Sequence, residues 1–560
     1  METMTPQMAD QRARNYFNKR LGALRTERAS WIPQCKEISD NIQPVRGRYF
    51  LTDHNQGQAR HNLIIDNTGT RALNTMAAGL MAGMTSPARP WFRLAVADPE
   101  AMEYAPVKVW LAEVTRIMRG IFARSNIYRA LHAQYEELGA FGTSASIIDD
   151  DYGKIIRGHT LTCGEYMIAQ NEKQQVDTLY REFEMQVGQI VAKFGLKNCS
   201  VAIQNAYSHG HYDQWRPVVH AVEPRTHRDK TKRDSKNMPY RSVYFESGNR
   251  EHEFLGESGY HEFRILAPRW TVVGGDTYGW GPGMQALGDV KQLQRSQLMK
   301  GKAIDYQADP PIQIPSGMKN TGDVDILPGG SSYYNEMAGP SGGIKTAFDV
   351  NLRLDHLLAD INDTRDRVRS AFFVDIFLMI SQMDATVTAT EIIARQEEKL
   401  LMLGPVLERL HTELLDPLID VTFNRALRTG ILPPAPQELE GMDLKVEYVS
   451  MLAQAQRAIG TNAIDRVIGT VGNVAAIGRT DALDKLDVDE LIDTYSDMLG
   501  VDPDLINANE DVAIIRKQRA EQQQQQAQLE AAPGAAQAAK TMSEIDPGQV
   551  QQATSQFSGI

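Results

Sequence analysis

Gly279, Gly281 and Gly283 stand at alternate positions just before a predicted helix, a pattern that could cradle a phosphate. The three glycines lack the complete dinucleotide fingerprint and the βαβ setting that goes with it. The sequence also contains no G-x-x-x-x-G-K-[ST] phosphate loop, so an ATP-driven motor is not expected. We interpret the glycines as a hinge leading into the helix and predict no cofactor.

Acidic and imidazole side chains offer two candidate metal sites. The run Asp149–Asp151 ends an expected strand and could bind a cation, although a plain acidic turn is the favoured interpretation. The pair His209 and His211 could begin a site, but no third ligand follows at helical or hairpin spacing. Cys163 has no identifiable histidine partner for nucleophilic catalysis. We therefore predict neither a metal nor a catalytic centre.

Basic side chains on two predicted helices form the most substantial candidate site. The six residues are Lys291, Arg295, Lys302, Arg365, Arg367 and Arg369. They could lie on solvated faces, form ion pairs between subunits, or make transient contacts with nucleic-acid phosphates. The sequence leaves these alternatives open.

Length and composition bound the classes of protein that this chain can be. Its 560 residues predict about three or four domains, and 42% hydrophobic residues suffice for several cores. The formal net charge of -12 argues against a generally basic nucleic-acid binder, so any contact with DNA must be local or weak. The longest apolar window, Leu73 to Met84, is too short to cross a bilayer. The polar N-terminus indicates no signal peptide, and the cysteines, few and scattered, are expected to be reduced thiols: Cys35, Cys163 and Cys199.

The N-terminal half reads as helices followed by short strands. We predict helices over 6–43, from about Ile65 to Thr85, and over 104–141, with Asp66, Asn67 or Thr68 as the N-cap of the second. Short β-rich runs separated by Gly, Pro, Asp and Asn fill 143–279, interrupted by one expected helix over Tyr180–Phe194. The fold class is therefore α+β and mainly helical, with an antiparallel sheet.

The chain from Met284 onward predicts helices of matched length around a small insert. Helices are expected over 284–309 and 351–374, and the Pro- and Gly-rich segment between them should form a lobe of short strands. A loop over 375–387 should precede a long helix over 388–428, kinked at Pro405 and Pro417. Residues 431–515 are expected to be mostly helical, and 516–560 form a low-complexity tail.

Several long and unusual sequence blocks resemble the head-to-tail connector, or portal, proteins of short-tailed bacteriophages. The longest runs from Ile64 to Phe92, and shorter ones are Phe141-Gly142-Thr143, Tyr180-Arg181-Glu182-Phe183, Asp309-Pro310-Pro311, Thr388-Ala389-Thr390-Glu391 and Leu403-Gly404-Pro405-Val406. The resemblance covers about residues 10–440. It implies a ring of twelve subunits at one capsid vertex of the virion, through which double-stranded DNA is packaged and ejected.

The resemblance also implies a division of the chain into the parts of such a ring. These are a wing (1–283 with the helix 388–430), a stem (284–309 and 351–374), a clip (310–350), a channel loop (375–387, including Ser381, Gln382, Met383 and Asp384), a crown (431–515) and a tail (516–560). The implied partners are further copies of the chain, the DNA, the major capsid and scaffolding proteins, the terminase during packaging and tail adaptor proteins afterwards. Assembly is expected in the host cytoplasm, with no membrane contact and no enzymatic activity.

Two other functions remain open from the residues alone. One is an oligomeric virion scaffold or tail component that passes no DNA, and the other is a metal-dependent nucleic-acid enzyme built on Asp149–Asp151. We also predict that Trp91 and Phe92 are core anchors of the first 283 residues, because large aromatic side chains bury most of their area in a core.

Overall fold

The computed structural model describes most of the first 450 residues and little beyond them. The described residues are 6–54, 57, 59–60, 63–96, 98, 102, 104–248, 254–315, 327–334, 345–346, 355–382, 403–439, 444–449, 469–471, 488, 491 and 512–523. They fall into two compact units, of which the first contains 1–95, 110–435 and 443–456. The second contains 96–109, 436–442 and 457–560. In the described part of the chain, no helix combines the length and apolar character needed to cross a membrane.

The first predicted helix is two helices, α1 (Pro6–Ala29) and α2 (Ile32–Asn41). Pro33 occupies the first turn of α2, where its missing N–H costs no hydrogen bond, so the chain restarts a helix there instead of continuing one. Phe17, Leu21 and Leu24 on α1 are buried against the large sheet. The prediction of continuous helix over 6–43 was therefore wrong at residues 30–31.

Helices α3 (Thr68–Met84), α5 (Ala105–Arg124) and α6 (Ile127–Phe141) surround an aromatic core. The strand β1 (Phe92–Val96) follows Trp91, whose ring lies 4.5 Å from Phe92 and 5.8 Å from Phe122, between centroids. Gly139 brings α6 against Met76 of α3, because a Cβ at this position would overlap the Met76 side chain. The prediction that Trp91 and Phe92 are core residues is confirmed, since both are 1% exposed.

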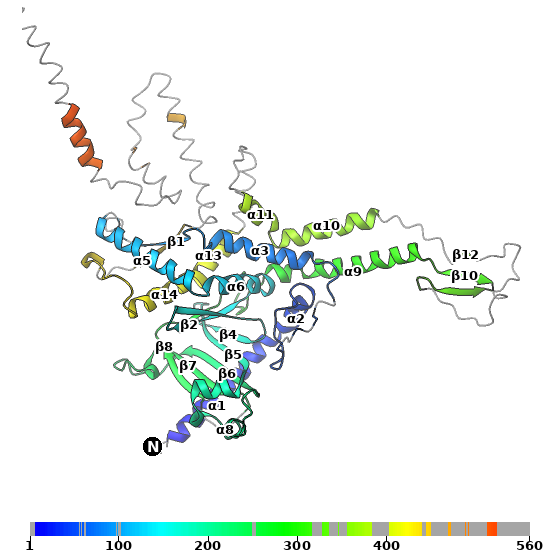
Figure 1. Cartoon of the computed structure of the whole chain (residues 1–560), viewed down its shortest axis with the longest axis horizontal. Helices are drawn as coiled ribbons and strands as arrows, with labels where there is room; N and C mark the ends of the chain where they lie inside the picture. Colours follow the sequence, from blue (N-terminus) through cyan, green and yellow to red (C-terminus); the bar gives the residue numbers. More distant parts are fainter. Residues whose placement is uncertain are drawn as a thin grey trace, which may run out of the picture. The chain divides into compact units, whose positions relative to one another are not determined.

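Two antiparallel sheets occupy 145–266 (Figure 1). The smaller one orders β3 (Ile155–Leu161), β2 (Ala145–Asp151) and β9 (Ile265–Leu266). The larger one orders β4 (Tyr166–Gln170), β5 (Val176–Gln186), β6 (Trp215–Pro224), β7 (Tyr240–Glu246) and β8 (Gly256–Tyr260). Helices α7 (Val187–Phe194) and α8 (Val201–Ser208) connect β5 to β6.

The predicted helix over Tyr180–Phe194 is wrong in its first half. Residues up to Gln186 continue β5, and helix begins only at Val187. Pairing decides this, because β5 is flanked on both sides, with Tyr180 opposite Met167 of β4 and Ala221 of β6. A central strand satisfies its backbone groups on both edges, which outweighs the modest helix preference of Arg, Glu and Met.

Two helices, α9 (Pro282–Ala308) and α10 (Asp355–Ala371), extend from the helical core as a pair with short strands at the far end (Figure 1). Those strands are β10 (Ile312–Pro315), β11 (Ser331–Tyr334) and β12 (Lys345–Thr346). They form a three-stranded sheet with β10 in the centre. The predicted pair of helices around a small β lobe is thus present.

The segment after α10 differs from the predicted loop. Residues Val374–Gln382 form the helix α11, which packs against α3, where a Cβ at Gly79 would overlap Phe377. Burial of Val374, Ile376 and Phe377 favours helix over loop. Residues 383–402, which contain the rest of the predicted loop and the start of the long helix, lie outside the described residues.

The described part of the predicted long helix is divided into three segments. They are α13 (Gly404–Leu410), a π-helical turn over His411–Leu415, and α14 (Asp416–Arg428). Pro405 and Pro417 each lie in the first turn of a segment, where proline is tolerated. The N–H of Asp416 donates to the carbonyl of His411, the bond of a π turn, immediately before Pro417, which has no N–H to donate.

The region after Gly430 begins with a 3-10 turn at Gln437–Leu439 and the strand β13 (Leu444–Tyr448). This strand pairs with β1, and an ion pair of 2.7 Å joins Glu447 Oε2 to Arg93 Nε. The expectation of helix at the start of this region was wrong, because Leu-Lys-Val-Glu-Tyr alternates with the period of a strand. Residues 512–523 are helical, and most of the predicted crown and tail lie outside the described residues.

Candidate functional site

The α9–α10 pair, called the arm below, changes character along its length. Every buried residue of α9 lies between Pro282 and Gln294, so the first half of the helix packs into the body of the first unit. Beyond Gln294 the helix exposes Leu298 (45%), Met299 (45%) and Ile304 (44%). Apolar side chains that stay exposed along an extended element offer a surface that another molecule can cover.

The far end of the arm is the three-stranded sheet, called the tip below. Asp309 follows α9, and Pro310-Pro311 then prevents the helix from continuing. The carbonyl of Asp309 accepts a hydrogen bond of 2.9 Å from the N–H of Gly329, which has a φ of +72°. Strand β10 pairs in parallel with β11 and antiparallel with β12, so the two helices are joined by sheet hydrogen bonds at the tip.

The base of the arm is held by the buried carboxylate of Asp66. Its Oδ2 accepts hydrogen bonds from Arg365 Nη2 at 2.8 Å and Nε at 3.1 Å, and from Gln297 Nε2 at 2.9 Å. Burial alone would raise the pKa of Asp66. Hydrogen bonds from the hydroxyl and N–H of Thr68, together with Arg365, outweigh that effect and hold the pKa below its ordinary value. One carboxylate thus joins the start of α3 to both arm helices.

Gln294 completes this base with three hydrogen bonds to one loop. Its Oε1 accepts from the N–H groups of Ile65 and Asp66 at 2.7 and 2.8 Å, and its Nε2 donates to the Asp66 carbonyl at 2.8 Å. The side chain is 7% exposed, so these bonds satisfy polar groups that have little access to water. The position of Asp66 before a helix suggested an N-cap, but only the tertiary structure brings it to the arm.

A cavity of about 810 Å³ lies beside this base. The loop before α3, the first turns of α3, both arm helices and Val374 line it. Arg71 and Arg369 bring guanidinium groups to the cavity, where Asn67 and Thr70 add further polar side chains. Its lining mixes these polar and basic groups with apolar side chains, among them Val45, Ile64 and Val374.

Four of the six basic residues singled out in the sequence form ion pairs within the chain. Arg365 binds Asp66, and Arg367 Nε lies 3.5 Å from Asp289 Oδ1 of the other arm helix. The remaining two pairs are Arg369 with Asp366 at 2.9 Å and Lys291 with Glu37 at 3.0 Å. Arg295 and Lys302 are exposed and have no ion-pair partner within the described residues. The six residues thus divide into four with an ion-pair partner and two without one, although Lys291, Arg367 and Arg369 are also about half exposed.

Ser381 and Gln382 are the last two residues of α11, and Met383 and Asp384 lie outside the described residues. The structure therefore describes only the helical start of the predicted channel loop.

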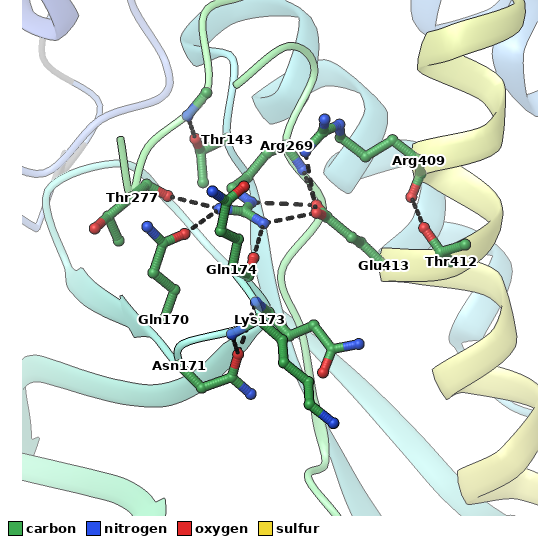
Figure 2. A network of polar contacts seen from close by, with 12 residues as sticks. Thr143, Gln170, Asn171, Lys173, Gln174, Arg269, Thr277, Arg409, Thr412 and Glu413 are labelled. Atoms are coloured by element: carbon green, nitrogen blue, oxygen red, sulfur yellow. Dashed lines mark hydrogen bonds and ion pairs between the residues drawn. The ribbon is translucent and has the colours of Figure 1, made fainter. Parts of the chain in front are cut away.

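A second network of polar contacts, called the Arg269 node below, surrounds Arg269 in the segment that precedes α9 (Figure 2). Sequence patterns did not reveal it. Arg269, only 1% exposed, donates to Glu413 Oε1 from Nη2 at 2.7 Å, and its N–H donates to Glu413 Oε2 at 2.9 Å. The same guanidinium donates to Gln170 Oε1 at 2.9 Å and to the Gln174 carbonyl at 2.6 Å. The node therefore joins the π turn, the β4–β5 hairpin and the segment before α9.

The glycines that suggested a phosphate site or a hinge pack tightly instead. A Cβ at Gly279 or Gly281 would overlap the backbone of Gly142, and one at Gly283 would overlap the backbone of Ala140. Gly142 itself ends α6 with a φ of +69°, where a side chain would be strained. The interpretation as a hinge was wrong, because these contacts fix the entry to α9 against the end of α6.

Side chains at the two candidate metal sites contact other protein groups. Asp150 forms ion pairs with Arg264 at 2.9 Å and Arg425 at 3.2 Å, and Asp151 accepts hydrogen bonds from the N–H groups of a turn. His209 Nδ1 lies 2.6 Å from the carbonyl of Asn205. Within the described ranges, no group of three or more His, Cys, Asp or Glu residues could hold a metal ion. The three cysteines are free and buried: Cys35, Cys163 and Cys199.

Comparison with known proteins places these features in a family. The model of the bacteriophage head to tail connecting protein matches residues 14–506. The chain is 57% identical over 525 residues to a probable portal protein of Bordetella phage BPP-1, covering 93% of this chain and 94% of that protein. It is 44% identical over 528 residues to a portal protein of Salmonella phage epsilon15, covering 94% of each. Among solved structures, a chain from the neck of an empty GTA particle aligns with a TM-score of 0.37 at 13% identity, over 82% of this chain and 96% of that one.

Proposed function

The chain belongs to the family of bacteriophage head to tail connecting proteins, and we propose on that premise that the arm is the wall of a DNA channel in a ring of its copies. As a portal protein it is a structural component of the capsid vertex. The observation that carries the proposal for the arm is the exposure of three apolar residues on different sides of the outer half of α9, Leu298, Met299 and Ile304. Neighbouring arms packed side by side in a ring would cover them.

The base of the arm supports the same role. A channel wall must keep its angle to the body of the subunit while DNA moves past it. The Asp66 carboxylate, Arg365, Gln294 and Gln297 hold both arm helices to the start of α3 through a set of hydrogen bonds in a mostly buried place. Charge-assisted bonds of this kind restrict orientation as well as adding stability.

Contact between the arm and DNA is assigned to Arg295 and Lys302. The other four basic residues are engaged in ion pairs within the chain, which leaves them weaker attraction for phosphates. A conduit benefits from few such contacts, because each neutralised phosphate adds salt-sensitive affinity that would retard sliding. We assign the channel loop to the residues after α11, including Met383 and Asp384, with Ser381 and Gln382 at its helical start.

The further division of the chain follows from the family. The arm would be the stem, the tip the clip, residues 1–283 with 388–430 the wing, and 431–515 the crown. In this arrangement the tip would face the terminase during packaging and tail adaptor proteins afterwards. Capsid and scaffolding proteins would meet the wing, twelve copies would form the ring, and assembly would take place in the host cytoplasm.

Electron microscopy of the purified protein tests the central proposal. We expect rings with a central hole wide enough for duplex DNA, and compact monomers at high protein concentration would overturn it. Deletion of residues 383–387 should leave rings intact and impair packaging or retention of DNA. If rings with that deletion package and retain a full genome normally, the assignment of the channel loop is wrong.

The alternative of a scaffold without DNA passage predicts oligomers that lack such a hole. A metal-dependent nucleic-acid enzyme is disfavoured by the pairing of Asp150 with two arginines, Arg264 and Arg425. Asp150→Ala would abolish metal-dependent nicking of a plasmid if that alternative were true. We expect no nicking by the wild-type protein or by the Asp150→Ala variant.

A further inference from the structure

The loop between β6 and β7 (residues 225–237, the basic loop) carries a net positive charge in a chain that is negative overall. It contains six Lys or Arg residues and two Asp residues, a net charge of +4, whereas the whole chain carries -12. All of its residues from Thr226 to Lys236 are exposed. The loop belongs to the large sheet rather than to the arm, so it lies outside the proposed channel wall.

The basic loop has a defined fold of its own. Its ends are joined by the N–H of Arg225, which donates to the Pro239 carbonyl at 2.7 Å, and the Arg225 guanidinium binds Glu257 of β8 at 3.0 Å. The backbone at Ser235 packs so closely on β8 that a Cβ at Gly259 would overlap its carbonyl. These interactions anchor the loop on the edge of the sheet.

The two acidic residues of the loop accept hydrogen bonds from other residues of the loop. Asp229 Oδ1 accepts hydrogen bonds from the N–H and hydroxyl of Thr231 at 3.0 and 2.6 Å. Asp234 Oδ1 accepts from Asn237 Nδ2 at 2.6 Å, and Asn237 Oδ1 accepts from the N–H of Asp229 at 2.9 Å. Internal hydrogen bonding of the acids leaves the cations as the groups that the loop presents to solvent.

Four of those cations have no ion-pair partner within the described part of the chain: Arg228, Lys230, Arg233 and Lys236. Lys232 lies 3.6 Å from Asp229 Oδ2, an exposed pair that contributes little. An ordered group of unpaired cations attracts a polyanion, and a fixed backbone reduces the entropy lost on binding.

We propose that the basic loop binds the phosphate backbone of duplex DNA outside the channel. The residues from Thr226 to Lys236 include no aliphatic side chain and no Phe, Tyr or Trp. A protein partner would be expected to bury such anchors at the centre of its interface, whereas phosphate contacts need only charge and hydrogen-bond donors. The binding is independent of base sequence and sensitive to salt, as suits DNA that must be packed and released.

The proposal concerns a surface of the same portal ring, but it does not depend on passage of DNA through that ring. The test uses assembled rings and a fluorescent, covalently closed DNA minicircle, which cannot thread a closed ring because it has no ends. The variant is R228Q/K230Q/R233Q/K236Q. The control K154Q/R157Q/K173Q/K197Q removes the same charge from exposed residues elsewhere on the body.

Binding of the minicircle is measured by anisotropy over a range of salt concentrations. Each neutralised phosphate contributes about 0.9 to the slope of log K against log salt, so we expect the loop variant to lower the magnitude of that slope by about three to four. The control variant should keep the wild-type slope. An unchanged slope in the loop variant, or an equal decrease in the control, overturns the proposal.

A parallel titration with polyglutamate separates DNA from an acidic protein partner. If the loop variant loses binding to polyglutamate but retains binding to the minicircle, the proposal is wrong and an acidic protein is the partner. Micrographs of each variant report ring formation separately. Failure of the wild-type protein to form rings would count against the proposed channel, while loss of minicircle binding on loop neutralisation would still support the loop assignment.

Discussion

The body of the first unit and the arm differ in how far they bury their large side chains. The body covers a core of large side chains with its own chain: Trp91, Phe122, Tyr135 and Tyr180 are each at most 1% exposed. It also surrounds the Arg269 guanidinium with polar partners. The outer half of α9 is not buried in the body and leaves Leu298, Met299 and Ile304 exposed. The difference indicates that the body contains a core of its own, whereas the outer half of the arm depends on other molecules to cover its apolar side chains.

The strongest test of this contrast is truncation in the body. Trp91→Ala should lower the free energy of unfolding by about 3–5 kcal/mol, because it removes a buried indole and leaves a cavity. Thermal or urea unfolding measures the change. Trp280→Ala is the control, since that side chain is 44% exposed, and it should cost less than a third as much. Equal losses for the two variants would contradict the assignment of Trp91 to the core.

Removal of the carboxylate from the Arg269 node should have the next largest effect. Glu413→Ala leaves a buried guanidinium without its charged partner, which costs about 3 kcal/mol in urea unfolding. The matched change Arg409→Ala removes a partly exposed cation that lies 3.4 Å from the same carboxylate, and we expect a loss below about 1 kcal/mol. A loss for Glu413→Ala no larger than that for Arg409→Ala would mean that Arg269 is held by its other hydrogen bonds.

Loss of the cation at the base of the arm should be smaller and dependent on pH. Arg365→Met removes two hydrogen bonds to Asp66 and should cost about 1–2 kcal/mol at neutral pH. The pKa of Asp66 is lowered in the folded protein, so its contribution to stability is present above the ordinary carboxyl pKa and is lost as pH falls through the folded value. Without Arg365 that pKa rises, and acid unfolding should begin at a higher pH. Arg369→Met, which removes an exposed pair, should leave the acid transition in place.

The smallest effect on the subunit should accompany a large effect on assembly. Leu298→Gln with Ile304→Gln exchanges two exposed apolar residues for good helix formers and should change the free energy of unfolding by no more than about 0.5 kcal/mol. The proportion of rings in micrographs should nevertheless fall. Val201→Gln with Leu427→Gln makes the same exchange at exposed sites of the body and should leave rings unaffected. Loss of rings in both pairs would remove the distinction between arm and body.

Sequence patterns predicted most elements but not where several of them end. The helix at Thr68–Met84, the matched pair α9 and α10 and the small β lobe followed from periodicity and from Pro and Gly punctuation. The errors at β5 and α11 have one cause. In each, pairing or packing against a distant segment set the local structure, as when β6 on one side and β4 on the other extended β5 to Gln186.

The chain by itself determined its family, the two-helix arm with its Pro-stopped tip, and the acidity that limits contact with DNA, because these depend on local pattern and composition. Tertiary structure alone decided which acidic residues the basic residues pair with. Arg365 and Arg367 look alike in the sequence, yet one binds a buried Asp66 and the other spans to Asp289. It also joined Arg269 to Glu413 across 144 residues, since side chains that distant meet only when the intervening helices and sheets have packed.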